Sequence, residues 1–148
     1  MRTKLAGKIE AGEKISIAHG GGGEMMTASS RATSFRGWAT DSSTRLNDSA
    51  IFEPTNKRTA FTTDAFVVQP LEFPGGDIGR LAMCGTINDL AVMGATPTAL
   101  SLALVVEEGL PLSVLDRILD SIAETAATAN VVVATGDTKV IERAAATG

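Results

Sequence analysis

The chain has 148 residues, of which 44% are hydrophobic and 20% charged, and its formal net charge is −4. This length predicts one domain with a substantial core, and the composition is typical of a soluble globular protein. The acidic balance and the scattered Lys and Arg argue against a nucleic-acid surface, and no apolar stretch is long enough for a membrane span. With a single cysteine, Cys84, and no secretory pattern at its start, we expect a cytoplasmic protein.

The first third of the chain predicts little regular structure. Residues 1–13 are polar and are expected to form a tail that precedes a domain over residues 14–148. An alternating pattern predicts a short strand over Lys14–Ala18, just before the glycine run Gly20–Gly23. The segment Thr27–Asn47 is rich in Ser, Thr and Arg and has no helical stripe, so we expect a loop there.

From residue 60 onward, predicted strands alternate with predicted helices. Ala60–Val68 is enriched in Thr, Phe and Val, which favours a strand. Asp77 is a natural N-cap for a helix from Ile78 to about Met93, and Gly94 is expected to end that helix. Thr98–Val106 is nearly all apolar, which predicts a strand covered on both faces.

A second helix is expected to begin with a capping box made by Ser113 and Asp116. Val131–Ala134 then predicts a short buried strand that ends before Asp137. This succession predicts an α/β or α+β domain whose helices pack on a mixed sheet. The apolar stripe of the second helix has helical spacing and consists of Leu115, Ile118, Leu119, Ile122, Ala126 and Ala129.

Three aspartates, Asp64, Asp89 and Asp137, lie at the edges of apolar runs among Gly, Thr and Asn. Mg²⁺ prefers a few carboxylate oxygens and takes water and phosphate in its other positions, so three acids that converge on one cleft would suit a magnesium–phosphate site. For Asp89, inside an apolar helix, a metal and a buried hydrogen-bond network would both compensate the charge. Asp137 follows a predicted strand end, where ligands of α/β sheets commonly bind.

Other candidates have two interpretations each. The run Gly20–Gly23 is either a flexible turn or a loop whose backbone N–H groups wrap phosphate oxygens, and it is not a Walker loop because Glu24 follows it. His19 either anchors a loop or takes part in proton chemistry. Asp77 is better explained as an N-cap than as a ligand, and Cys84 as a packing residue than as a nucleophile.

The chain contains, in this order, IAHGGGG, TTDAFVVQPLEFPGGDIGRLAMCGTINDLAVMGATP, VVEEGLP and TGDTKV. Their wording and spacing resemble the N-terminal domain of the HypE family of hydrogenase-maturation proteins. The TTD, NDLAVMGA and GDT elements are shared with the wider ATP-binding superfamily of aminoimidazole ribonucleotide (AIR) synthetase, selenophosphate synthetase and thiamine-monophosphate kinase. FPGGDIG, CGT, EEGLP and TGDTKV resemble HypE in particular, and the likeness covers residues 14–145 except the Ser/Thr/Arg-rich segment.

This resemblance implies a homodimer whose strands form a barrel across its centre, with ATP in a cleft beside acidic residues that hold Mg²⁺. Asn47 stands where the family's D-D-A-A-V element has its first acid, and Asp48 matches the next position. By motif match, the implied metal residues are Asp48, Asp64, Asp89 and Asp137. The implied ATP-binding residues are Gly20, Gly21, Gly22, Gly23, Asn88 and Thr138.

In proteins of this kind, ATP activates the oxygen of a carbamoyl group on a C-terminal cysteine, and loss of that oxygen as phosphate leaves a thiocyanate, the source of cyanide for nickel–iron hydrogenase. The implied partners are a carbamoyltransferase and iron-scaffold proteins. The sequence stops before the family's C-terminal domain and cysteine tail, so no catalytic residue is expected here and the chain alone should not complete the dehydration. Two alternatives remain: a related enzyme such as a selenophosphate synthetase or thiamine-monophosphate kinase, and a non-catalytic dimerisation fragment.

Overall fold

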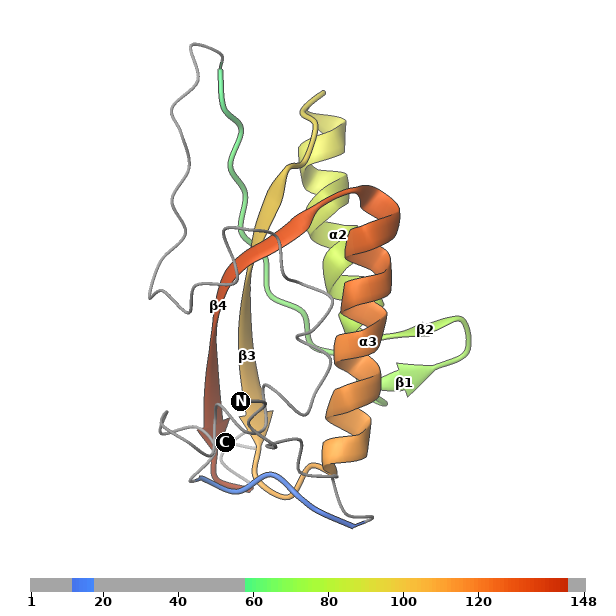
Figure 1. Ribbon diagram of the computed structural model, residues 1–148, viewed down its shortest axis with the longest axis vertical. Helices are drawn as coiled ribbons and strands as arrows, with labels where there is room; N and C mark the ends of the chain where they lie inside the picture. Colours follow the sequence, from blue (N-terminus) through green and yellow to red (C-terminus); the bar gives the residue numbers. More distant parts are fainter. Residues whose placement is uncertain (1–11, 18–57, 144–148) are drawn as a thin grey trace, which may run out of the picture.

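The computed structural model describes residues 12–17 and 58–143. One antiparallel hairpin and one parallel two-stranded sheet are present in this part of the chain, and the parallel strands are joined through a helix (Figure 1). Helices and both kinds of strand pairing therefore occur together, as predicted for an α/β or α+β domain. The elements in chain order are β1 (Glu72–Phe73), β2 (Gly76–Asp77), α2 (Ile78–Val92), β3 (Ala99–Glu107), α3 (Leu112–Ala129) and β4 (Val132–Ile141).

Helix α2 begins and ends where the sequence predicts. The Asp77 carboxylate accepts a hydrogen bond from the backbone N–H of Arg80 at 2.9 Å, which satisfies one of the unpaired donors at the helix start. At the other end, Gly94 has a φ of +70°, and its N–H donates to the carbonyl of Ala91 at 2.9 Å. This left-handed conformation favours glycine and ends the helix.

The apolar stripe of α3 is confirmed, but its predicted capping box is wrong. The helix begins at Leu112 directly after Pro111, and no side chain caps it. Because Pro111 occupies the N-cap position, Ser113 lies inside the first turn and its hydroxyl is past the position from which it could cap the helix. One oxygen of Asp116, Oδ1, is instead buried without a hydrogen-bond partner in the described residues. Burial raises the pKa of Asp116, and the nearby carboxylate of Asp120 adds to the rise.

Helices α2 and α3 lie side by side, and a glycine permits their close approach (Figure 1). A Cβ at Gly79 would lie 2.6 Å from the carbonyl oxygen of Ile118 and 2.8 Å from Cγ1 of Ile122. Ile122 is the most buried large side chain among the described residues, with 1% of its surface exposed. The main hydrophobic core therefore lies between the two helices and the parallel sheet, where it includes Met83, Val106, Leu112, Leu115, Ile118, Leu119, Ile122 and Val133.

Within the described residues, strand β3 packs against the core on one face only, which corrects the prediction of a strand buried on both. Leu102 and Leu104 pack against the core, whereas Ser101, Ala103 and Val105 are exposed. Val105 has 68% of its surface exposed. Because successive side chains of a strand point to opposite faces, these three residues mark an open face of the parallel sheet.

Strand β4 is longer than predicted and runs from Val132 to Ile141. The polar TGDT stretch was expected to end it, yet Gly136 and Asp137 pair with Leu102 and Ala103 of β3. A Cβ at Gly136 would lie only 2.3 Å from the carbonyl oxygen of Leu102, so a glycine lets the two backbones approach there. Asp137 therefore lies in the middle of a strand and not beyond its end.

Two other predicted strands do not form in the described residues. Residues 58–68 have no regular secondary structure, because no described strand is hydrogen-bonded to this extended segment. β propensity alone does not make a strand, since a ladder needs a partner. In Lys14–Ala18, only an isolated bridge between Lys14 and Pro111 is present, and Ala18 lies outside the described residues.

The segment 12–17, before the glycine run, is nevertheless hydrogen-bonded to the rest of the domain. The backbone N–H of Ile15 donates to the carbonyl of Leu110 at 2.9 Å, and the N–H of Gly109 donates to Ile15 at 2.8 Å. Ile15 is only 5% exposed and belongs to the core. The carboxylate of Glu108 accepts a hydrogen bond from the N–H of Ile17 at 3.3 Å. The loop after β3 thus fastens the N-terminal segment to the domain.

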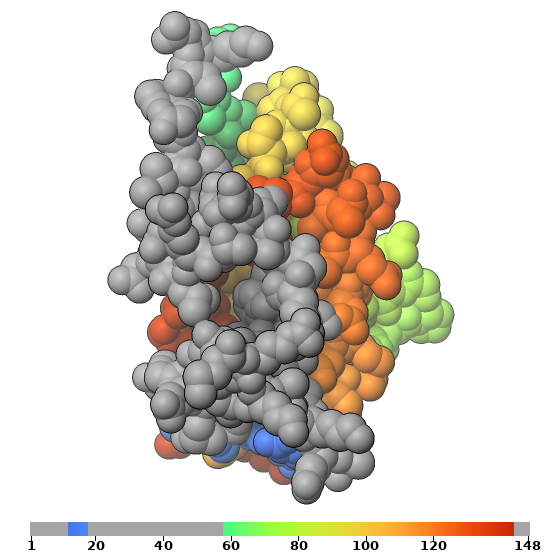
Figure 2. All heavy atoms as spheres, in the orientation of Figure 1, coloured from blue at the N-terminus to red at the C-terminus, as the bar shows by residue number. Residues whose placement is uncertain are grey.

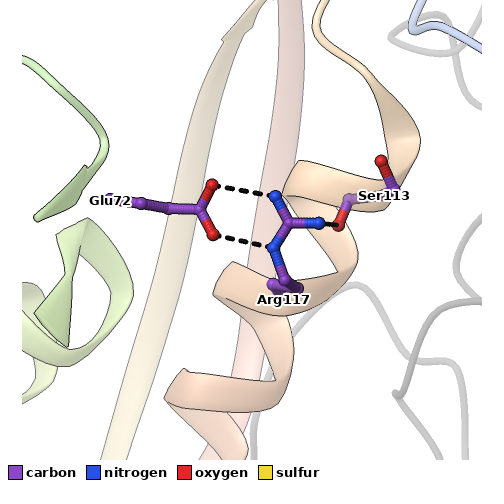
Figure 3. A network of polar contacts seen from close by, with 3 residues as sticks. All are labelled: Glu72, Ser113 and Arg117. Carbon is purple, nitrogen blue, oxygen red and sulfur yellow. Dashed lines mark hydrogen bonds and ion pairs between the residues drawn. The ribbon is translucent and has the colours of Figure 1, made fainter.

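An ion pair fastens the β1–β2 hairpin to α3 (Figure 3). Arg117 donates to both carboxylate oxygens of Glu72, at 2.7 and 2.8 Å, and also to the carbonyl of Ser113 at 3.0 Å. This hydrogen bonding lowers the pKa of Glu72 and raises the pKa of Arg117. In Figure 2 the hairpin, in yellow-green, projects from the molecule beside α3, in orange.

Candidate functional site

A threonine links the segment that carries one predicted metal aspartate to the helix that carries another. Asp89 lies near the end of α2, and Asp64 lies in the extended segment that precedes the hairpin. The hydroxyl of Thr62 donates to Oδ2 of Asp89 at 3.4 Å. Two residues of extended chain span at most about 7 Å, so this bond brings Asp64 into the neighbourhood of Asp89.

Both carboxylates are exposed and keep capacity for a further ligand. Oδ1 of Asp64 accepts a hydrogen bond from the N–H of Ala65 at 2.8 Å, and Oδ2 of Asp89 accepts the one from Thr62. Each bond engages one of the two carboxylate oxygens. Because Asp89 is exposed, the penalty for a buried charge that the sequence suggested does not arise.

Asp137 lies apart from this pair in its interactions. It is exposed on β4, and the ammonium group of Lys139 contacts its two oxygens at 2.8 and 2.7 Å. The hydrogen bond from Lys139 lowers the pKa of Asp137, so this carboxylate is ionised at neutral pH with its charge compensated by its own strand. A cation at Asp137 would have to compete with Lys139.

The predicted convergence of the three aspartates is not found. In residues 12–17 and 58–143, no three His, Cys, Asp or Glu side chains are grouped so that they could hold a metal ion. Secondary structure explains why the three do not converge. Asp137 lies in the middle of β4, whereas Asp89 lies on α2 and Asp64 lies on the segment that contacts α2. Their assignment as metal ligands stays a prediction.

The donor set at Asp64 and Asp89 fits a magnesium–nucleotide complex better than a free ion. Mg²⁺ in nucleotide sites is commonly held by one or two carboxylates, with phosphate oxygens and water as its other ligands. The exposed carboxylates of Asp64 and Asp89, on neighbouring segments, supply these two protein ligands and leave the other positions of the cation to phosphate and water. The pair therefore suits a cation that arrives together with phosphate groups.

The other predicted site residues are distributed as follows. Asn88 is exposed on α2 beside Asp89, and Thr138 is half-buried in β4 beside Asp137. Cys84 is half-buried within α2, as expected of a packing residue. Outside the described residues lie His19, Asp48 and the glycines Gly20, Gly21, Gly22 and Gly23.

Three residues near Asp64 had not been singled out from the sequence. Thr62 binds Asp89, and the ring of Phe66 lies against Gly85 on α2. A glycine inside a helical pattern is a recognisable signal, because it costs helix stability and often marks a close contact. Thr62 and Phe66 carried no such signal, since Thr and Phe are common in any strand-like segment.

Comparison with known proteins places this chain in a family. Residues 46–147 match the family model described as AIR synthase related protein, N-terminal domain. The chain belongs to this family, and its α/β arrangement of helices and mixed strand pairing is the arrangement of that domain.

The relatives within this family are hydrogenase-maturation proteins. The chain is 47% identical over 139 residues to the carbamoyl dehydratase HypE of Rhodobacter capsulatus, which covers 92% of this chain and 41% of that protein. A crystal structure of the hydrogenase maturation protein HypE in complex with ATP is similar with a TM-score of 0.82 and 39% identity, over 87% of this chain and 38% of the other. The chain thus spans about two fifths of the length of these relatives.

A third comparison concerns an assembly. The crystal structure of a HypE–HypF complex contains a chain that is similar with a TM-score of 0.55 and 51% identity, over 55% of this chain and 27% of that one. As for membranes, no helix in the described ranges is both long enough and apolar enough to span one.

Proposed function

We propose that this chain is the ATP- and magnesium-binding N-terminal domain of a HypE-type carbamoyl dehydratase that acts in nickel–iron hydrogenase maturation. The observation that carries the proposal is the 47% identity to a carbamoyl dehydratase HypE over 92% of the chain. The similarity to a HypE structure in complex with ATP supports nucleotide binding. The FPGGDIG, CGT, EEGLP and TGDTKV stretches favour this over a selenophosphate synthetase or a thiamine-monophosphate kinase.

The chemistry follows from leaving-group quality. A carbamoyl oxygen departs poorly, but the same oxygen departs readily once a phosphoryl group has been transferred to it from ATP. Bound Mg²⁺ would supply positive charge that stabilises the negative charge developing during this transfer. Asp64 and Asp89 would hold the metal, with Asn88 beside them. In this proposal the chain contributes the part of the reaction that binds ATP and activates the carbamoyl oxygen.

Calorimetric titration with Mg-ATP tests the proposal. We expect binding heat from this chain and an affinity weaker by about tenfold or more for Asp89→Asn, because an amide loses the charge that attracts the cation. Asp120→Asn is the matched control: it removes an exposed aspartate on α3, away from Asp89, and should bind like the wild type. EDTA should abolish the metal-dependent part of the heat in all three proteins.

The outcomes separate the alternatives. A folded wild-type chain that gives no heat with Mg-ATP would refute nucleotide binding by this chain and favour a non-catalytic dimerisation fragment. Equal affinities for wild type and Asp89→Asn would remove Asp89 from the metal site. Circular dichroism of each protein confirms that the comparison is made between folded samples.

We also propose that two copies of the chain associate through the open face of the parallel sheet and the unpaired segment 58–68. The support is exposed apolar surface: Phe61 is 88% exposed, Val67 is 97% exposed and Val105 is 68% exposed. Such side chains next to an extended segment without a ladder partner are typical of surfaces that pair with another strand. A strand-like sequence at 60–68 would then find its partner in the second copy.

Light scattering tests this dimer. We expect a mass of twice 15.3 kDa for the wild type at micromolar concentration and a shift toward 15.3 kDa for Val67→Asp, because a buried unpaired charge opposes association. Ala127→Asp, on the exposed side of α3, is the control that should leave the mass unchanged. A monomeric wild type, or a dimeric Val67→Asp, would contradict the proposed interface.

A carbamoyltransferase is the partner that we propose for this protein. The HypE chain of a HypE–HypF complex is similar to this one, which supports a HypF-type partner. Iron-scaffold proteins remain a prediction from the family resemblance.

A further inference from the structure

The extended segment that carries Asp64 touches α2 at two points, one on each side of the aspartate. On one side, Thr62 donates a hydrogen bond to Asp89 at 3.4 Å. On the other side, the ring of Phe66 lies so close to Gly85 that a Cβ there would be 2.5 Å from Cζ and 2.6 Å from Cε1 of the ring. Only a residue without a side chain allows the Phe66 ring to reach the helix at this position.

These two contacts join the segment that carries Asp64 to the helix that carries Asp89. Residues 58–68 pair with no strand among the described residues, so no ladder holds them. The hydroxyl contact is long for an O–H···O bond and is exposed, which makes it the weaker of the two. The Phe66 ring, seated in a gap that only glycine leaves, is therefore the firmer attachment.

We infer that Phe66 and Gly85 are positioning residues for Asp64 in the magnesium–nucleotide site, an inference that rests on the proposed function. Phe66 acts through its ring, which sits on the helix two residues after Asp64. Gly85 acts through the space that its missing side chain leaves for the ring. It lies one helical turn before Asp89, and because residues four apart share a helix face, the ring packs on the face that carries Asp89. Neither residue contacts the cation. Both decide where one of its carboxylates lies.

The contact lies outside the hydrophobic core, so it is better suited to placing the segment than to stabilising the domain. The core cluster and the side chains packed against it include neither Phe66 nor Gly85. Phe66 is half-buried, and both residues before it are exposed. Loss of the contact should release the segment while the helices and the parallel sheet persist.

Gly85→Ala is the decisive variant. Alanine is the better helix former, so α2 should keep its structure while the new methyl group displaces the ring. We expect the affinity for Mg-ATP to fall by about 10- to 100-fold, the usual loss when a residue that orients a metal ligand is changed. Phe66→Leu should have a similar effect. The double variant should bind no more weakly than the weaker single variant, because both changes remove the same contact.

Two readouts separate positioning from a general loss of structure. First, affinity for ATP measured in EDTA should be unchanged in the variants, so that only the magnesium-dependent gain is lost. Second, nuclear Overhauser contacts between the Phe66 ring and the Gly85 Hα protons should be present in the wild type. Contacts between Thr62 and Asp89 should weaken in Gly85→Ala. Phe73→Leu is the matched control, since Phe73 is a half-buried aromatic residue of the hairpin that packs beside Gly76.

The inference and the proposed function fail in different ways. A wild-type chain without Mg-ATP binding overturns the proposed function and, with it, the nucleotide part of the inference. Wild-type binding that Gly85→Ala and Phe66→Leu leave unchanged overturns the inference alone. An equal loss in EDTA and in magnesium, or an equal loss in Phe73→Leu, would show a structural effect and would also overturn it.

Discussion

We expect Ile122→Ala to lower the free energy of unfolding by about 2–5 kcal/mol, the range for removing a large aliphatic side chain from a packed core. Ile122 is 1% exposed and lies where α3 meets Gly79 of α2. Because Gly79 has no side chain, it cannot fill the space that the isoleucine leaves. The cavity should therefore stay open, which places the expected loss toward the upper part of that range.

Urea denaturation followed by far-UV circular dichroism measures this loss. Ile122→Val should lower the free energy of unfolding by about 0.5–1.5 kcal/mol, because it removes a smaller volume of side chain than Ile122→Ala does. Glu124→Ala, on the exposed side of the same helix, should stay within about 0.5 kcal/mol of the wild type. A loss below about 1 kcal/mol for Ile122→Ala would mean that the two helices are not packed as described.

The second large effect is expected for Gly136→Ala, which should destabilise the chain by about 1–3 kcal/mol through overpacking. The added methyl group would lie 2.3 Å from the backbone carbonyl oxygen of Leu102. A backbone atom cannot turn away as a side chain can, so β3 and β4 must separate at this point. Asp137 is the next residue and should shift with the strand.

Thermal unfolding and the affinity for Mg-ATP should be measured on the same Gly136→Ala protein. Ser101→Ala, at an exposed position of β3, is the control and should change stability by no more than about 0.5 kcal/mol. A Gly136→Ala protein as stable as the wild type would show that β3 and β4 are farther apart than the structure places them. Lower stability with unchanged Mg-ATP affinity would indicate that Asp137 takes no part in the nucleotide site.

Local signals were sufficient for the helices. Asp77 and Gly94 have side-chain and backbone properties that act within a few residues, and both ends of α2 fall where these residues predict. The stripe of α3 is a property of spacing along one helix, and its inner residues are the buried ones. The capping box failed because Pro111, two residues before Ser113, starts the helix without a side-chain cap.

Strands were predicted less well because their limits depend on a neighbour. β4 continues through polar TGDT because β3 supplies hydrogen-bond partners as far as Ile141. Residues 60–68 have strand-like composition, yet they form no ladder because no described strand lies beside them. In both cases the presence or absence of a hydrogen-bonded partner strand, and not the composition, decided the outcome.

The sequence by itself determined the helices and the family, and it singled out the acidic residues as candidate metal ligands, because caps, stripes and motif wording are local properties. Only the tertiary structure decided how those acids relate to one another. It joins the segment that carries Asp64 to α2 through the hydrogen bond from Thr62 to Asp89, and it leaves Asp137 paired with Lys139 on β4. The physical reason is that the surroundings of a carboxylate depend on which segments pack together. Here the Phe66 ring, packed against Gly85, determines where the segment with Asp64 lies.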